Sequence, residues 1–351
     1  MKLGLGFYQH MLNRRHFDFA KQCGCSHVVV HLVDYFNKGS QENINNQPIG
    51  NGAGWGIAGK SNHLWELDSL IRLKKEINAA GLEWEAIENF DPADWHDILL
   101  DGPKKKKQIG LLKQHIRNVG KAGIPVIGYN FSLAGVSSRI TGPFARGGAF
   151  SVGMNGVDDC IIPNGMVWNM IYDMNANGGF LPGITHDELW QRLEWFLKEV
   201  IPVAEEAGVK LAAHPDDPPV PTIRNTPRLV YQPYMYQRLL DICLSPNNTL
   251  EFCLGSLAEM TEGNVYDAAR QYADHISYIH FRNVKGKVPG YKEVFIDEGD
   301  IDMIEIIRIL KEKRFDGVLI PDHTPQMSCE GSWYAGMAYA LGYMKALIQT
   351  V

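Results

Sequence analysis

The sequence lacks the features of a nucleic-acid-binding protein or a membrane protein. Lys and Arg number 34 against 40 Asp and Glu, which gives a net charge of −6 and no general basic face. The one basic run, Lys104–Lys107, follows Asp101-Gly102-Pro103 and is either the solvated start of a helix or a phosphate contact. No apolar stretch reaches the roughly 18 residues that a transmembrane helix needs. We therefore expect neither a nucleic-acid partner nor a membrane segment.

Cysteines are also few and widely spaced. The chain has six, with no Cys-x-x-Cys pair and none of the dense framework that disulfide-rich domains have. The first residues, Lys2–Phe7, are too few and too glycine-rich for the apolar part of a signal peptide. The sequence thus predicts a cytoplasmic protein with reduced thiols, any of which is free to bind a metal.

What the sequence does contain is a repeated turn from helix to strand. Ala80-Gly81, Ala122-Gly123 and Ala207-Gly208 each end a helical pattern and precede an apolar, strand-like run. Glycine just after a helix adopts a positive φ without steric cost, so it ends the helix and turns the chain into the next strand. Repetition of this unit is typical of α/β proteins with a parallel sheet.

Eight strands that alternate with helices can be traced along the chain. We expect a capping box, Thr185-x-x-Glu188, to begin one helix, Pro202 to kink or divide it, and Asp300 to cap a later one. The alternation predicts a single (β/α)₈ TIM-barrel domain over residues 1–351. The alternative is a doubly wound open sheet, but no dinucleotide-binding glycine fingerprint follows the first strand. Strands are expected at 2–7, 26–31, 83–88, 124–130, 209–214, 249–253, 276–282 and 317–321, and helices at 13–22, 63–80, 104–122, 185–207, 231–243, 264–273, about 300–314 and from about 331.

One long connection does not fit a minimal barrel. Residues 132–184 follow the fourth strand, contain ten glycines and carry Arg139 and Arg146 among aromatic side chains. A connection of this length is usually functional or disordered. We expect this glycine-rich insertion to be a lid or a subunit-contact element on the carboxyl-end face of the barrel, with a plain spacer as the alternative.

Seven of the eight expected strands end on a residue that can bind a metal, exchange a proton or form a hydrogen bond. Functional residues of such barrels lie at the carboxyl ends of the strands. The pattern therefore predicts a functional site at this end of the barrel. The seven residues are His31, Glu88, Asn130, His214, Cys253, His280 and Asp322.

Four of these residues form a candidate metal site. His214, Cys253, His280 and Asp322 come from the fifth to eighth strands, which are neighbours around a barrel. Their mixed N, S and O donors suit Mn²⁺, Fe²⁺, Co²⁺ or Zn²⁺ rather than Mg²⁺ or Ca²⁺. Taken singly, Cys253 also fits a small core residue and His280 a core histidine. The joint placement favours the metal.

Further polar residues surround this set. Asp216 and Asp217, fixed between prolines in the run 214–219, either orient a ligand or belong to a rigid surface turn. Arg282 follows His280 on the same strand face, where it either holds a substrate carboxylate through two hydrogen bonds or pairs with Glu251.

Several motifs, in their order along the chain, resemble those of D-mannonate dehydratases. The run His214-Pro215-Asp216-Asp217-Pro218-Pro219 is the most specific of them. The others are Ile116-Arg117-Asn118-Val119-Gly120-x-Ala122-Gly123-Ile124, Gly128-Tyr129-Asn130-Phe131, Cys253-x-Gly255-Ser256, His280-x-Arg282-Asn283-Val284, Gly299-Asp300-x-Asp302-Met303 and Pro321-Asp322-His323.

The resemblance covers most of the chain and implies a Mn²⁺-dependent barrel hydro-lyase. Such an enzyme converts D-mannonate into 2-keto-3-deoxy-D-gluconate and water, and its ligand positions match the four named above. The resemblance also implies a small-molecule sugar acid as partner and a homo-oligomer. It fails after Phe131, where the family continues with Met-Pro and this chain has Ser132-Leu133, and Met337 stands where the family has an arginine.

Dehydration of an aldonate needs one group that removes the proton beside the carboxylate and one that protonates the leaving hydroxyl. His323 is the first candidate, although it also fits a role in holding Asp322; Tyr334 is the second, and His31 is the third. The alternatives are a metal-dependent sugar isomerase or epimerase on the same barrel, and a non-catalytic protein that binds metal and a sugar acid. The residues expected to contact the substrate are Arg282, Asn130, Glu88, Asp216 and Arg139.

Overall fold

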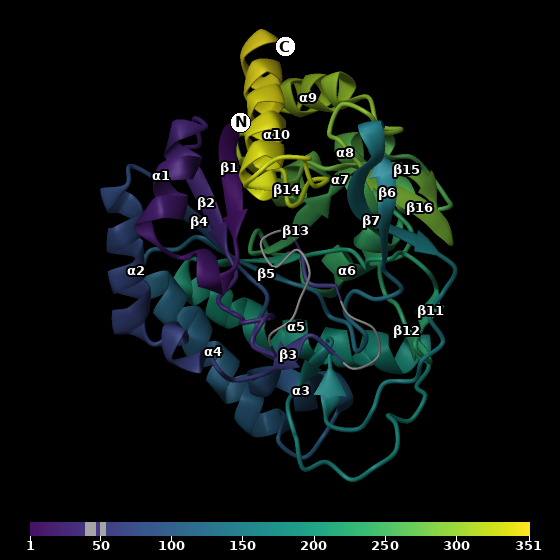
Figure 1. The fold of residues 1–351 in the computed structure, drawn as a ribbon. Coiled ribbons are helices and arrows are strands. Elements are labelled where there is room, and N and C mark those ends of the chain that lie inside the picture. Colours follow the sequence, from purple (N-terminus) through teal and green to yellow (C-terminus); the bar gives the residue numbers. More distant parts are fainter. Residues whose placement is uncertain (39–46, 50–53) are drawn as a thin grey trace.

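The computed structural model describes residues 1–38, 47–49 and 54–351, and its centre is a closed barrel of parallel strands (Figure 1). Because β1 pairs with both β2 and β17, the sheet has no open edge. The TIM barrel is thus confirmed, and the open-sheet alternative is wrong. Around the barrel the strands follow in the order β1 (Lys2–Phe7), β17 (Val318–Ile320), β14 (Ile276–His280), β13 (Asn248–Cys253), β10 (Lys210–Ala213), β5 (Val126–Tyr129), β4 (Glu83–Glu88) and β2 (His27–Val30).

Helices surround the barrel. Figure 1 shows α1, α2 and α4 along one side and α9 and α10 where the chain ends. Their apolar stripes pack against the outward faces of the strands, as expected for amphipathic helices. The helices are α1 (Arg14–Gln22), α2 (Leu67–Ala79), α3 (Pro92–Leu100), α4 (Lys105–Lys121), α5 (His186–Ala207), α6 (Met235–Ile242), α7 (Leu254–Glu259), α8 (Val265–Tyr272), α9 (Met303–Glu312) and α10 (Ser332–Thr350).

The interior of the barrel is filled by a second, smaller apolar cluster that includes Val29, Val126, Tyr278 and Ile320. Side chains alternate between the two faces of a strand, so every second residue points inward. Gly128 leaves room in this layer, because a Cβ there would lie 2.2 Å from the hydroxyl of Tyr278. The filled interior supports the polar residues at the strand ends above it.

Most helix boundaries agree with the sequence analysis, and two details differ. Thr185 and Glu188 form the expected capping box, but α5 runs through Pro202 without being divided. Asp302, not Asp300, caps α9, since its side chain accepts the N–H groups of Ile304 and Glu305. The short helices α3 and α7 were not expected.

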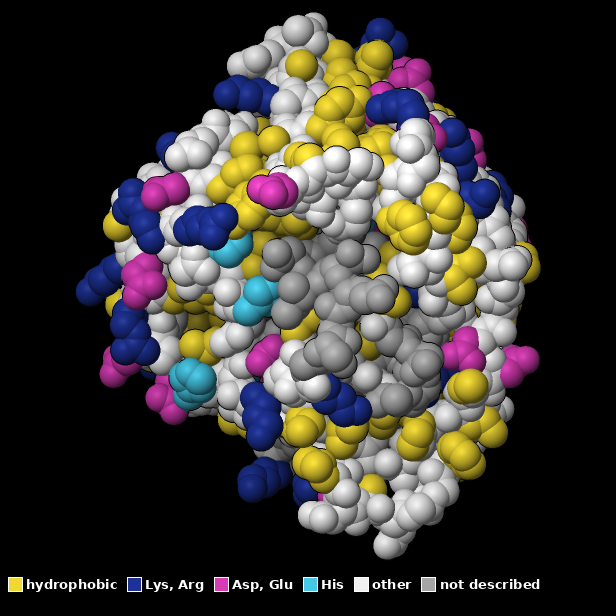
Figure 2. All heavy atoms as spheres, in the orientation of Figure 1, with side chains coloured by type: hydrophobic (Ala, Val, Ile, Leu, Met, Phe, Trp, Pro, Cys, Tyr) yellow, Lys and Arg dark blue, Asp and Glu magenta, His cyan; other side chains and the backbone are white. Residues whose placement is uncertain are grey.

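The glycine-rich insertion, residues 132–184, is built from short strands. Strands β6 (Ile140–Ala145) and β7 (Ala149–Asn155) extend a hairpin of β15 (Asn283–Lys287) and β16 (Gly290–Val294). Strands β8 (Met166–Val167) and β9 (Met170–Ile171) pair with β3 (Gly56–Ile57). Figure 2 shows hydrophobic side chains at the surface on the side of β6 and β16. The exposed hydrophobic side chains of the insertion are Ile140, Phe150, Val157, Ile161, Met174 and Phe180.

Across the described ranges, no helix has the length and apolar character to cross a bilayer. All six cysteines are free thiols.

Candidate active site

The carboxyl ends of the barrel strands meet at one cavity, which is lined by ionisable groups and by aromatic rings. The residues expected there from the strand-end pattern all reach it, except that Cys253 lies in the cluster beside it. The lining residues are Tyr8, His31, Tyr35, Gln47, Pro48, Trp55, Glu88, Asn89, Asn130, Val136, Arg139, Trp168, His214, Asp217, His280, Asp322 and His323.

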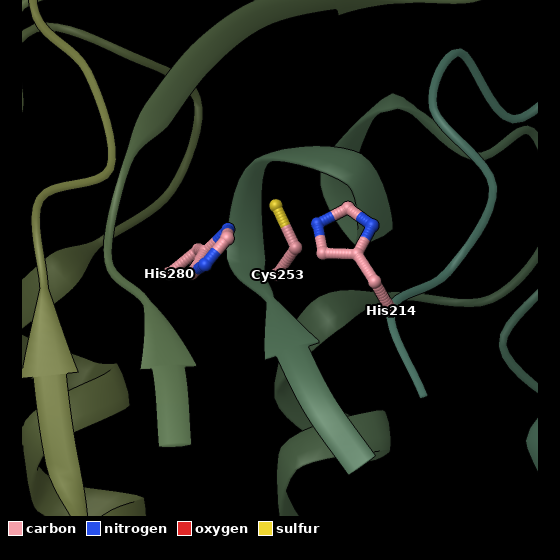
Figure 3. A group of neighbouring side chains, drawn as sticks. All are labelled: His214, Cys253 and His280. Carbon is pink, nitrogen blue, oxygen red and sulfur yellow. The ribbon is translucent and has the colours of Figure 1, made fainter. Parts of the chain in front are cut away.

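Three of the four expected metal ligands form a tight cluster. One donor atom from each of His214, Cys253 and His280 lies within 4.8 Å of the other two. Figure 3 shows the sulfur of Cys253 between the two imidazole rings, with Cys253 and His280 at the ends of neighbouring strands. These distances fit coordination of one ion.

The protonation of the cluster also suits a metal. Nδ1 of His214 lies 2.6 Å from the carbonyl oxygen of Pro215 and donates to it, which leaves Nε2 free to bind an ion. Burial alone raises the pKa of Cys253, but Arg282 and the two histidines outweigh it and hold this pKa well below 9. The thiolate is the form that binds metals. Both ring nitrogens of the buried His280 face carboxylates, Nε2 toward Glu251 at 3.1 Å and Nδ1 toward Asp322 at 3.4 Å. The donor set therefore fits a borderline divalent ion.

Asp322 lies beside this cluster. Its Oδ2 is 3.4 Å from Nδ1 of His280 and 3.1 Å from Nε2 of His323. The backbone of Asp322 is in the left-handed region, with φ 61°, and such strained residues are concentrated at functional sites. Asp322 is therefore positioned to reach an ion on His280 and to contact His323.

Glu88 lies directly beside the cluster, and His31 lies beside Glu88. Nε2 of His31 lies 3.5 Å from Oε2 of Glu88, and the same oxygen lies 3.4 Å from Nε2 of His280. Burial would raise the pKa of Glu88, but the two histidines lower it to about 2. Glu88 is thus an anion that links the two histidines.

Three of the expected substrate contacts line the cavity: Glu88, described above, Asn130 and Arg139. Asn130 donates from Nδ2 to the carbonyl oxygens of His214 and Pro215 and accepts a hydrogen bond from Nε1 of Trp168. Arg139 also lines the cavity and donates to the carbonyl oxygen of Pro48. Asn130 lies just before the glycine-rich insertion, and Arg139 lies within it.

The structure does not bring Tyr334 or Asp216 to the cavity. Tyr334 lies in α10, and its hydroxyl is 3.1 Å from Nε2 of His16 in an outer groove beside α1. Asp216 is turned into the protein, where it accepts the N–H groups of Leu229 and Val230 and pairs with Arg228 at 3.1 Å. Tyr334 is placed by helix packing, and Asp216 fixes a loop.

Arg282 is also placed differently from both interpretations of the sequence. Its guanidinium is 3% exposed and lies 2.7 Å from Oδ2 of Asp217 and 2.8 Å from Oε1 of Glu259. Glu251, the partner that the sequence suggested, contacts His280 instead. Arg282 therefore binds protein carboxylates beneath the cavity, and its charge supports the thiolate of Cys253.

Comparison with known proteins identifies the family. The sequence model of the D-mannonate dehydratase (UxuA) family matches residues 40–141 and 162–351. The chain belongs to this family. Mannonate dehydratase of Streptococcus equi subsp. zooepidemicus is 34% identical over 278 residues, 74% of each chain. The crystal structure of mannonate dehydratase from Streptococcus suis serotype 2 matches with a TM-score of 0.76 at 28% identity, over 99% of this chain and 93% of that one. A D-psicose 3-epimerase from Clostridium cellulolyticum H10, at 12% identity and TM-score 0.60 over 99% of both chains, shares the fold.

The family model leaves residues 1–39 and an internal segment of this mannonate dehydratase homologue, residues 142–161, unmatched, and the internal segment contains β7 and most of β6. Strand β7 pairs with β16, which carries Glu293. The carboxylate of Glu293 lies 2.9 Å from Nδ1 of His323 and accepts a hydrogen bond from Gln47. The unmatched hairpin thus borders the residues that hold His323.

The sequence analysis missed several residues of the site, among them Tyr8, Glu251 and Glu293. Tyr8 directly follows β1, lines the cavity and stacks on His31 at 4.8 Å between ring centres. The strand-end pattern would have found Tyr8 if it had been applied to the first strand as well. Glu251 precedes Cys253 by two residues on the same strand face, which is a readable signal. Glu293 lies on a hairpin, where no sequence pattern indicated it.

The charge of His323 gives a prediction for the metal-free protein. Burial by itself lowers the pKa of His323, but the carboxylates of Asp322 and Glu293 outweigh it and raise this pKa from 6.5 to about 9. The resulting stabilisation is complete below pH ~6.5 and is lost as the pH rises through about 9. We expect the free energy of unfolding of the chelated protein, measured with urea, to fall over this range. The pKa values of His214 and His280 are raised as well, so His323→Gln should reduce the fall without abolishing it, and an unchanged slope in the variant would contradict the prediction.

Proposed function

We propose that this chain is a Mn²⁺-dependent hydro-lyase that converts D-mannonate into 2-keto-3-deoxy-D-gluconate and water. The observation that carries the proposal is the His214-Cys253-His280 cluster, which opens onto the same cavity as His323 and Arg139 in a chain of this family. Fe²⁺, Co²⁺ and Zn²⁺ are the other ions that suit these donors.

The reaction removes a proton from C2 of the sugar acid and hydroxide from C3, and the enol that forms becomes the 2-keto acid. A bound divalent ion supplies Lewis-acid stabilisation of the negative charge that develops beside the carboxylate. Arg139 is the only arginine among the cavity-lining residues that the structure describes, and it suits a substrate carboxylate through two hydrogen bonds. Asn130 is placed to contact a hydroxyl of the substrate.

Two groups are positioned to move protons. His323 carries a proton at neutral pH because its pKa is raised to about 9, so we assign it the protonation of the leaving hydroxyl. His31, which also lines the cavity, has a pKa lowered by burial and is neutral. We assign His31 the removal of the C2 proton. The aromatic side chains between these groups and solvent exclude water from the reacting carbons.

The first test is metal analysis combined with product analysis. We expect about one divalent ion per chain and formation of a 2-keto-3-deoxy acid from D-mannonate with added Mn²⁺. An epimer or a ketose without the keto-deoxy acid would show an isomerase or epimerase instead. Tight binding of a sugar acid without any product would show a non-catalytic binding protein. Absence of bound metal under all loading conditions would reject the proposal.

We also propose that the protein is a homo-oligomer of the cytoplasm whose partner is a small sugar acid. The exposed hydrophobic side chains of the insertion support an interface between copies of the chain.

A further inference from the structure

Glu251 is a buried carboxylate to which no step above gives a role. It lies on β13 two residues before Cys253, so both side chains point toward the barrel axis, with Glu251 one layer deeper. Its side chain is fully buried, and the hydroxyl of Tyr278 interacts with it. A neutral hydroxyl does not balance the charge of a buried carboxylate, which is costly without a further partner.

The compensating group is His280. Oε1 of Glu251 lies 3.1 Å from Nε2 of His280, and His280 is the ion-pair partner of Glu251 within the described part of the chain. Glu88 also approaches this nitrogen, at 3.4 Å, but Glu88 contacts His31 as well. The other ring nitrogen, Nδ1, faces Asp322 at 3.4 Å. The two nitrogens of His280 therefore face different groups: Nε2 the deep carboxylates, and Nδ1 an expected metal ligand.

We propose that Glu251 is a positioning residue that accepts a hydrogen bond from Nε2 of His280 and so leaves Nδ1 of this ring to bind the metal. The inference rests on the metal site of the proposed function. A histidine that binds a metal through one nitrogen usually donates the other N–H to a carboxylate or carbonyl, which fixes the ring and raises its basicity. His214 shows the complementary arrangement, since its Nδ1 donates to the carbonyl oxygen of Pro215 and Nε2 is the nitrogen that remains for the metal.

The layout of the barrel supports this assignment over a second ion. Donor atoms of Glu88, Glu251 and His280 also lie within 4.8 Å of one another, as an ion would require. Simultaneous ions on both nitrogens of His280 would require the ring to lose both of its N–H protons. A hydrogen bond from Nε2 to Glu251 leaves the ring neutral, satisfies a buried carboxylate and needs a single ion.

Metal affinity tests the proposal without any substrate. Chelated wild-type protein, Glu251→Gln and the control Glu85→Gln would be titrated with Mn²⁺ by calorimetry. Glu85 lies on β4, has the same side chain and contacts His27 at 4.0 Å, not His280. We expect one Mn²⁺ per wild-type chain, an affinity about 10–100-fold weaker for Glu251→Gln, and no change for Glu85→Gln. Equal affinities of Glu251→Gln and wild type, or two Mn²⁺ per wild-type chain, would overturn the proposal.

A second measurement needs no variant and so does not depend on folding of Glu251→Gln. In Zn²⁺-loaded wild-type protein, ¹⁵N NMR of the histidine side chains reports which ring nitrogen carries the proton. We expect the proton of His280 on Nε2, and a proton on Nδ1 would overturn the proposal. Both experiments are independent of turnover. If the affinity loss is found but D-mannonate gives no product, the proposed function fails and this inference stands. If Glu251→Gln binds Mn²⁺ as tightly as wild type and the wild type forms product, this inference fails and the proposed function stands.

Discussion

Cys253→Ala should leave the protein folded but without its metal and without dehydratase activity. The thiolate of Cys253 lies between His214 and His280, and alanine would leave two neutral imidazoles as the remaining members of the cluster. Loss of an outer partner of a ligand costs about 10–100-fold in metal affinity or activity, so loss of the ligand itself should cost more than about 100-fold. Metal content after dialysis and the rate of keto-deoxy acid formation measure the two effects.

Cys243→Ala is the matched control. Cys243 is a half-buried thiol that directly follows α6, and it belongs to neither the cluster nor the cavity lining. This variant should retain the metal and the wild-type rate. A Cys253→Ala protein with full metal content would show that the ion is held elsewhere, and a fully active one would remove Cys253 from the site.

Arg282→Met should destabilise the protein by about 3–5 kcal/mol, because it leaves buried carboxylates without their cation. Asp217 and Glu259 lie 2.7 and 2.8 Å from the guanidinium, and all three side chains are buried. Burial would raise the pKa of Asp217, but the charge of Arg282 outweighs it and the pKa is lowered to about 2. Asp217 is therefore an anion, and Arg282→Met leaves it buried without its counter-charge. Urea unfolding of the metal-free protein measures the loss, and Mn²⁺ affinity should fall as well, since Arg282 supports the thiolate of Cys253.

Arg238→Met provides the comparison. Arg238 pairs with Asp187 at 3.9 Å on the surface, where both side chains are more than half exposed. Such pairs contribute about 0–1 kcal/mol, so this variant should unfold at nearly the wild-type urea concentration. If Arg282→Met raised the KM for the sugar acid and left stability unchanged, Arg282 would contact substrate, as the sequence first suggested.

Sequence patterns located the site well where the chain itself sets the geometry. A residue at the carboxyl end of a parallel barrel strand must lie on one face, so His31, Glu88, Asn130, His214, His280 and Asp322 could all be placed before the structure was known. The prediction of Tyr334 was wrong, because this residue follows no strand and was suggested by motif position alone. The prediction that Asp216 contacts the substrate was also wrong. Adjacent residues point in different directions, and Asp217 is the one that lines the cavity.

Contacts between distant segments were beyond the sequence. Arg282 lies between Asp217, from the loop after β10, and Glu259, from α7, and no spacing along the chain indicates that pairing. Glu293 reaches His323 only because a hairpin after β14 folds over the mouth of the barrel and pairs with β7 of the insertion.

The sequence by itself determined the barrel, the strand ends and the cysteine and histidines of the cluster, because strand periodicity and helix-ending glycines act locally along the chain. Only the tertiary structure decided which charges meet. It turned Arg282 and Asp216 away from the cavity, placed Glu251 beneath His280 and brought Tyr8 against His31. The partner of a buried charge depends on how the barrel closes and how its loops pack. An ion pair depends on the distance between two groups in space, and their separation along the sequence does not predict it.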